Sequence, residues 1–131
     1  MYPTRGTSSP SFDRRLVWLL GVDYSRTVAY KLQMPTVKRT TEFSIWLKEL
    51  RDIRARAKIV ARIDRLALGN PGDVASVGSG VSEMRIHYGP GYRVYFAQRG
   101  AEVVVLLCGG DKGSQVSDIA TAKRLASELE D

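Results

Sequence analysis

Three short strand-like runs separated by glycine-containing turns constrain the fold of this chain more than any other feature. The connections between them are only three residues long, Gly89-Pro90-Gly91 and Arg99-Gly100-Ala101, and the runs themselves span residues 81–88, 92–98 and 102–108. Connections this short join antiparallel neighbours, because parallel strands need a crossover of a dozen or more residues. The pattern therefore predicts a three-stranded antiparallel meander.

A short edge strand and a helix are predicted ahead of this meander. Residues 35–40 form the candidate strand, with Pro35 at the first position, where a missing N–H does least harm. Thr41 is a candidate helix cap. After it, apolar residues recur at i, i+3, i+4 and i+7, the spacing of one buried helix face: Phe43, Trp46, Leu47 and Leu50.

Two further helices and a long loop complete the predicted elements. A second helix is expected over residues 56–68, followed by Gly69 as its left-handed terminal residue. Residues 69–80 contain four glycines and a proline and are predicted to be the longest loop. Gly109-Gly110 is expected to end the sheet, and a last helix is expected over residues 115–129.

This order of elements predicts an α+β fold, a small antiparallel sheet with two N-terminal helices and one C-terminal helix. The predicted domain covers residues 34–131. Residues 1–33 contain prolines, a Thr7-Ser8-Ser9-Pro10 run and no sustained hydrophobic period. We expect them to be an N-terminal extension, either a mobile arm or the result of a start upstream of a natural one at Met34.

Composition narrows the class of protein and its partners. The 131 residues are 44% hydrophobic and 26% charged, which is typical of one folded domain. A net charge of +6 makes polyanions plausible partners. A single cysteine, Cys108, favours a reducing cytoplasm and is expected to be a buried structural thiol. With one His and one Cys no metal site is expected; no other cofactor and no membrane span are expected either.

The central hairpin carries the candidate site. Successive strand side chains alternate between faces, so residues 83, 85 and 87 share one face of the first strand, and 93 and 95 share one face of the second. If these faces coincide, they form one basic, aromatic surface from Arg85, His87, Arg93 and Tyr95. The opposite face would then pack under helices through Met84, Ile86, Val94 and Phe96.

Such a surface suits RNA. Arginine presents a planar fork of donors to phosphate oxygens, and a tyrosine ring can hold an unstacked base. Cleavage without a metal needs a base for the 2′-hydroxyl, a cation beside the phosphorus and an acid for the leaving oxygen. The candidates for these catalytic roles are Arg85, His87, Arg93 and Lys112.

Simpler interpretations of the same residues remain open at this point. An exposed antiparallel sheet needs polar residues to stay soluble, and a solitary strand histidine is often a surface residue. Lys112 follows Gly109-Gly110-Asp111, where it could meet a phosphate at a helix N-terminus, pair with Asp111 or simply face water.

Several segments together resemble a known family. In order along residues 34–131 they are Phe43-x-x-Trp46-Leu47, Arg62-Ile63-x-Arg65-Leu66 up to Gly69-Asn70-x-Gly72-Asp73, Val77-Gly78-x-Gly80-Val81-x-Glu83-Met84-Arg85-Ile86, Gly89-Pro90-Gly91-Tyr92-Arg93-Val94-Tyr95, and Leu106-Leu107-x-Gly109-Gly110-Asp111-Lys112-x-x-Gln115-x-x-Asp118-Ile119. This set resembles the phage-derived, HigB-like killer proteins of the RelE/ParE superfamily.

The resemblance implies a RelE-like fold and a toxin of a type II toxin-antitoxin system. Such a toxin cleaves mRNA at the ribosomal A site and is neutralised by a HigA-like helix-turn-helix antitoxin. By position, Arg93 resembles the family's phosphate-stabilising arginine, and Arg85 stands near the basic residue proposed there as general base. Lys112 and Gln115 fall near a turn that carries further cationic groups. The toxin alone is expected to be monomeric and cytoplasmic.

Two departures from the family pattern affect these roles. Arginine is a poor general base, so with Arg85 in place of a lysine either His87 takes the proton or the chemistry rests on positioning. Residues 115–131 contain no aromatic residue, so Tyr92 or Tyr95 would have to supply the stacking ring. The main alternative function is a ParE-like inhibitor of DNA gyrase without nuclease activity, and another is a purely binding member of the superfamily.

Overall fold

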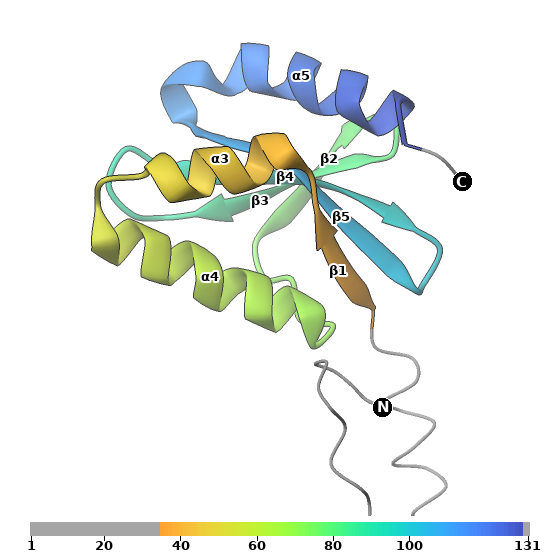
Figure 1. Ribbon diagram of the computed structural model, residues 1–131, viewed down its shortest axis with the longest axis horizontal. Coiled ribbons are helices and arrows are strands. Elements are labelled where there is room, and N and C mark those ends of the chain that lie inside the picture. Colours follow the sequence, from red (N-terminus) through yellow and green to blue (C-terminus); the bar gives the residue numbers. More distant parts are fainter. Residues whose placement is uncertain (1–34, 130–131) are drawn as a thin grey trace, which may run out of the picture. The chain divides into compact units, whose positions relative to one another are not determined.

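The computed structural model describes residues 35–129 as a five-stranded sheet with three α-helices and one 3₁₀ turn (Figure 1). The expectations for residues 1–33, and for a start at Met34, lie outside the described residues. In chain order the elements are β1 (Thr36–Arg39), α3 (Thr41–Glu49), α4 (Ile53–Ala67), β2 (Val74–Gly78), β3 (Val81–Ile86), β4 (Tyr92–Arg99), β5 (Val103–Asp111), η1 (Lys112–Ser114) and α5 (Gln115–Ser127).

The sheet is mixed, with the strand order β1-β5-β4-β3-β2. The pairs β3–β4 and β4–β5 are antiparallel, which confirms the predicted meander. The prediction of a wholly antiparallel sheet is wrong, because β1 pairs parallel to β5. A parallel pair is possible here because α3, α4 and three strands separate β1 from β5 along the chain.

Two local predictions about glycine were wrong. Residues 69–80 are not all loop, because β2 pairs antiparallel with β3 and the glycines lie at its ends. Nor do Gly109 and Gly110 end the sheet, since β5 continues through both to Asp111. They have a packing role instead. A Cβ on Gly109 would collide with the Trp46 ring, and one on Gly110 with the Asp118 carboxylate.

The helices begin where a polar side chain caps them. Thr40, one residue before the predicted cap, accepts a hydrogen bond from the N–H of Phe43 and starts α3. Asp52 accepts bonds from two N–H groups and starts α4 at Ile53, three residues earlier than predicted. Gly69 has φ +84° after the end of α4, as the sequence predicted.

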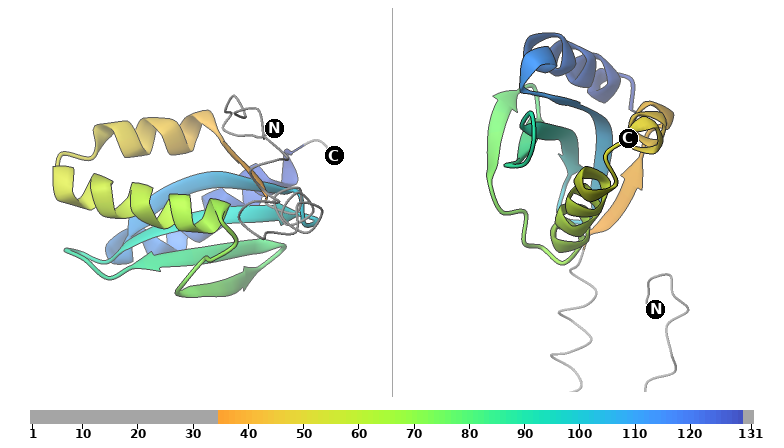
Figure 2. Two further views of the ribbon diagram at one scale, coloured as in Figure 1. Left: turned by 90° about the horizontal axis from the view of Figure 1, so that it is seen from below. Right: turned by 90° about the vertical axis from the view of Figure 1, so that its left-hand side faces the viewer.

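Helices cover both faces of the sheet, and each face has its own apolar cluster (Figure 2). Helices α3 and α4 lie side by side over one face, where they bury the predicted set Met84, Ile86, Val94 and Phe96. Helix α5 covers part of the other face, where it packs on Tyr95, Leu107 and Cys108. The face expected to be open to solvent is therefore partly covered.

Cys108 confirms its predicted structural role. Its side chain is buried against α5, and burial raises the pKa of the thiol to about 12, with the nearby carboxylates of Asp118 and Glu42 adding to the shift. The thiolate form is therefore scarce at neutral pH. Separately, none of the helices within residues 35–129 is long and apolar enough to cross a membrane.

Candidate functional site

Arg85 and Arg93 are direct cross-strand partners in the β3–β4 ladder. Both side chains therefore project from the same face, as the alternation of the two strands predicted. They lie near the end of the sheet where β3 ends, β4 begins and β5 runs into η1. Two like charges directly opposite each other repel, so this arrangement needs a counter-charge.

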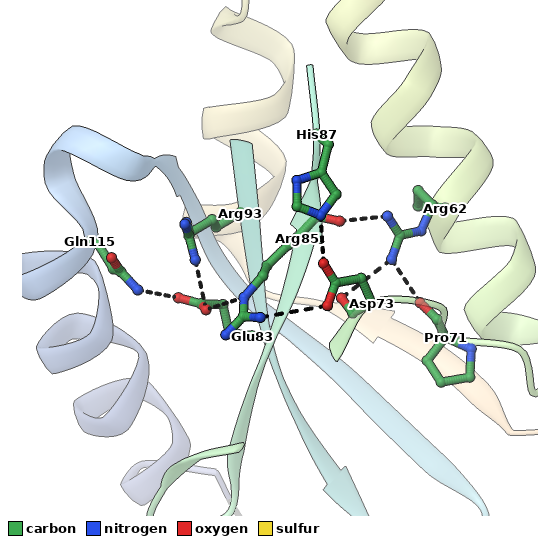
Figure 3. A network of polar contacts seen from close by, with 8 residues as sticks. All are labelled: Arg62, Pro71, Asp73, Glu83, Arg85, His87, Arg93 and Gln115. Carbon is green, nitrogen blue, oxygen red and sulfur yellow. Dashed lines mark hydrogen bonds and ion pairs between the residues drawn. The ribbon is translucent and has the colours of Figure 1, made fainter. Parts of the chain in front are cut away.

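Glu83 supplies that counter-charge from the same face of β3 (Figure 3). Its carboxylate is 1% exposed. Oε1 accepts hydrogen bonds from Nε of Arg85 at 3.0 Å and Nη1 of Arg93 at 2.8 Å. Oε2 accepts from the Tyr95 hydroxyl at 3.1 Å and from Nε2 of Gln115 at 2.9 Å. Four donors from β3, β4 and α5 thus converge on one carboxylate.

These contacts keep Glu83 ionised. Burial alone raises the pKa of the carboxyl, but hydrogen bonds from Arg85 and Gln115 and the charge of Arg93 outweigh it and leave the pKa below its usual value. A buried charge with this many partners is stable where an isolated one is not. Because Glu83 offsets one of the two guanidinium charges, the trio keeps a net charge of one positive unit.

Arg93 retains unused hydrogen-bonding capacity. Its side chain is 14% exposed, and its Nε atom is buried without a hydrogen-bond partner among residues 35–129. A buried donor in this state costs on the order of 1–3 kcal/mol. Because Nε itself is buried, a ligand would meet the exposed part of the Arg93 side chain instead.

Asp73 and His87 form a second pair beside this trio. Nε2 of His87 lies 2.5 Å from Oδ2 of Asp73, and Oδ1 of Asp73 lies 3.6 Å from Nη1 of Arg85. The hydrogen bond from His87 and the charge of Arg85 lower the pKa of the Asp73 carboxyl. An ionised carboxylate can only accept, so the His87 tautomer that fits this contact donates its Nε2 proton and keeps Nδ1 as an acceptor. The imidazole is 76% exposed and can reach a ligand.

Arg62 fixes the loop that carries Asp73. From α4, its Nη1 donates to the carbonyl of Arg85 at 2.5 Å, and its Nη2 donates to the carbonyl of Pro71 at 2.8 Å (Figure 3). A third, longer contact of 3.5 Å reaches the carbonyl of Asp73. The guanidinium therefore ties the β3 backbone to the segment before β2.

Lys112 and Gln115, two other predicted site residues, lie at the same end of the sheet. Gln115 begins α5 and binds Glu83, so its amide orients the site from within. Lys112 is exposed on η1, close to Gly91 of the β3–β4 turn. No contact joins it to Arg85, His87 or Arg93 within residues 35–129. Asp111 does not pair with it, because that carboxylate caps η1.

Neither tyrosine offers an open ring on the basic face, which the predicted stacking role requires. Tyr95 is on the expected face, but it is fully buried under α5 and has no open ring surface. Burial and the neighbouring Glu83 raise the pKa of its hydroxyl. Tyr92 alternates to the opposite face, where its ring meets Trp46 edge-on at 6.4 Å between centroids. Of the predicted aromatic side chains, only the His87 ring lies open on the basic face.

Sequence reasoning missed the acidic half of the site. Glu83 was placed on the correct face but given no role, although an acidic residue two positions before an arginine on one strand face is a signal for such a pair. Asp73 carried no usable signal. It lies 14 residues from His87, and the contact depends on β2 folding back beside β3.

Comparison with known proteins identifies the family. The model of the family described as "Phage derived protein Gp49-like (DUF891)" matches residues 45–127. A protein of Haemophilus influenzae that carries the description "Uncharacterized protein" is 53% identical over 93 residues, which are 71% of this chain and 94% of that protein. No solved structure matches the chain. The residues that the family model matches, 45–127, include every side chain of the site described above. The chain therefore belongs to the Gp49-like family, a phage-derived family of addiction-module toxins of the RelE and HigB type.

Proposed function

We propose that this toxin is a ribosome-dependent mRNA endoribonuclease that needs no metal ion. The observation that carries the proposal is the Arg85–Glu83–Arg93 trio beside an exposed imidazole. A site made for protein binding alone has no need of two guanidinium groups held at one carboxylate. A phosphodiester, by contrast, needs cations and a proton acceptor within reach of the same phosphorus.

His87 is the proposed general base. Because Asp73 holds the Nε2–H, the Nδ1 lone pair is available to take the proton of a ribose 2′-hydroxyl. The 2′-oxygen then attacks the adjacent phosphorus, and the bond from phosphorus to the 5′-oxygen breaks. This step leaves a 2′,3′-cyclic phosphate on one fragment and a 5′-hydroxyl on the other. The pairing with Asp73 favours His87 over Arg85, whose guanidinium stays protonated.

The two arginines have different parts in this proposal. Arg93, whose side chain is partly exposed, stabilises the charge that develops on the phosphoryl oxygens. Arg85 is 37% exposed and bridges Glu83 and Asp73, so it holds the phosphate beside the imidazole. Lys112, exposed at the same end of the sheet, is the proposed proton donor to the leaving 5′-oxygen. Glu83 and Asp73 are positioning residues.

The ribosome and an antitoxin are the proposed partners. The described site is a charged sheet end without an open tyrosine ring, so we infer that the ribosomal A site presents the mRNA in a reactive conformation. A HigA-like helix-turn-helix protein is the proposed antitoxin. The cytoplasm, where ribosomes are, is the proposed location.

Mapping of mRNA 5′ ends after a brief pulse of toxin expression tests the function. The proposal predicts new 5′-hydroxyl ends inside translated messages, in register with codons, with chromosomal DNA intact. Gyrase inhibition, the alternative, predicts DNA breaks with intact mRNA. A toxin that arrests growth without either signal would contradict both.

Arg93→Lys separates catalysis from folding in this test. Lysine keeps a positive charge for Glu83 but lacks the planar fork for a phosphate. We expect the new mRNA ends to disappear while the melting temperature stays close to that of the wild type. The matched control is Arg124→Lys on the exposed part of α5, which should cleave normally. Equal cleavage by both variants would remove Arg93 from the site.

A further inference from the structure

The outer face of α4 and Leu68, the residue that follows it, form an apolar stripe that is interrupted by Asp64 and that nothing in the described domain covers. Ile53, Val60 and Leu68 are 72%, 42% and 63% exposed, although each is a large aliphatic side chain. Ala57 and Asp64 stand between them and are also exposed. The steps of four and three residues from Ile53 through Ala57 to Val60 keep these side chains in one line, as in the seam of a helix pair.

A row of cations borders this stripe on one flank. Arg54, Lys58 and Arg65 follow each other by four and seven residues, so they form a second line along the helix. All three are exposed. None forms an ion pair with a carboxylate that the structure describes, and the only partner found for Lys58 is the Tyr88 ring, 5.2 Å from its Nζ. The row therefore presents charge that no described ion pair offsets.

We propose that this face of α4 binds an amphipathic helix with an apolar seam and an acidic flank, supplied by the antitoxin. This inference rests on the proposed function for the origin of the helix. Its apolar side chains would cover Ile53, Val60 and Leu68, and Ala57 would let the two backbones approach closely. Its acidic side chains would pair with Arg54, Lys58 and Arg65. The mode is the docking of a helix onto an exposed apolar seam.

Charge and polarity together select this occupant. RNA would satisfy the cations but gains little from three exposed aliphatic side chains. A second copy of the chain would bring the same cationic row, and like charges would meet. Residues 1–33 of this chain carry five basic and two acidic residues and have the wrong sign. An acidic amphipathic helix satisfies both the seam and the row.

The cationic row also faces the candidate site. Lys58 and Arg62 are one turn apart, and from this flank Lys58 reaches Tyr88 while Arg62 reaches the carbonyl of Arg85. A helix seated on the stripe would thus have its acidic flank at the rim of the site. It would add negative charge where an mRNA phosphate must approach. This repulsion would give a physical basis for neutralisation of the toxin by the antitoxin.

Binding of a synthetic peptide to the full chain tests this inference. The probe is a fluorescent amphipathic helix with leucine at heptad positions a and d and glutamate at e and g. Its control has lysine at e and g. We expect saturable binding of the glutamate peptide, measured by fluorescence anisotropy, and none of the lysine peptide. Val60→Glu, or Arg54→Glu with Arg65→Glu, should weaken binding by about tenfold or more.

Matched variants guard against trivial effects. Val116→Glu places the same change on α5 at a valine that is 86% exposed, and it should leave the affinity unchanged. Lys48→Glu on α3 is the corresponding control for charge. Circular dichroism melting of each variant shows that it is folded. A second measurement uses a short single-stranded RNA in place of the peptide.

The outcomes separate the inference from the proposed nuclease. Three results would each overturn the docking surface. The first is failure of the glutamate peptide to bind, and the second is equal binding of both peptides. The third result is RNA binding that depends on Arg54 and Arg65 while the peptide does not bind. Peptide binding is read without ribosomes or cleavage. Peptide binding with intact mRNA in cells would therefore leave the docking surface standing and remove the nuclease.

Discussion

Nη1 of Arg93 donates a 2.8 Å hydrogen bond to Oε1 of Glu83, and this carboxylate is almost completely buried. The contact makes the proposed phosphate-binding arginine part of the folded core. Substitutions that remove the charge of Arg93 therefore change stability as well as chemistry. Removing one partner of a buried charge pair leaves the other without compensation, which is more damaging than never having had the pair.

Glu83→Gln is expected to lower the free energy of unfolding by about 2 kcal/mol at pH 7, because the amide carries no charge to offset the two guanidinium groups and its NH₂ group cannot accept a hydrogen bond. The folded-state pKa of Glu83 lies below its usual value of 4.5. Its contribution is therefore present above about pH 4.5 and is lost as pH falls through the folded pKa. Urea unfolding between pH 7 and pH 3 should show a steeper loss for the wild type than for Glu83→Gln. An equal loss of stability with falling pH in the two proteins would mean that Glu83 does not stabilise the fold by its charge. Substitution of the exposed Glu49 by glutamine, Glu49→Gln, is the control.

Asp73→Asn is expected to lower kcat by about 10²-fold with little change in KM. Asparagine can donate to Nε2 of His87, which favours the wrong tautomer and puts a proton on the proposed base atom, Nδ1. Asp73→Glu should restore part of the activity, since it retains the carboxylate. Single-turnover cleavage on ribosomes gives both constants, with Asp64→Asn on α4 as control. A rise in KM alone would assign Asp73 to substrate binding instead.

Tyr95→Phe is expected to cost about 1 kcal/mol of stability and to leave RNA cleavage within about twofold of the wild type. The phenol is buried and its only described hydrogen bond is to Glu83, so it cannot contact an RNA base. Thermal unfolding and ribosome cleavage measure the two effects. If cleavage fell strongly while stability held, the hydroxyl would have to take part in the reaction.

Much of this architecture could be predicted because its signals are local. The hairpin turns at Gly89-Pro90-Gly91 and around Gly100 set the meander, and strand alternation placed Arg85 and Arg93 on one face. Pairings between distant segments could not be predicted. The strands β1 and β2 carry weak patterns, and their positions depend on partners far along the chain. For the same reason the role of Asp73 and the packing of α5 on Tyr95 could not be predicted, because both depend on tertiary packing.

Native Cys108 is expected to resist alkylation by iodoacetamide at pH 7, since burial keeps the thiol protonated and covered. Unfolding in urea should expose it fully. Because the chain has a single cysteine, the mass shift of the intact protein reports this site alone. Rapid labelling of the native protein would show that α5 opens easily from the sheet.

Cleavage of one defined mRNA on purified ribosomes tests the central claim most directly, in a buffer that keeps the Mg²⁺ the ribosome needs and contains a chelator selective for transition metals. The account predicts a cut within the A-site codon by the wild-type chain, with a cyclic phosphate on the upstream fragment. It also predicts loss of the cut in Arg93→Lys and in His87→Gln. Intact mRNA with the folded wild-type chain, or undiminished cleavage by both variants, would contradict it.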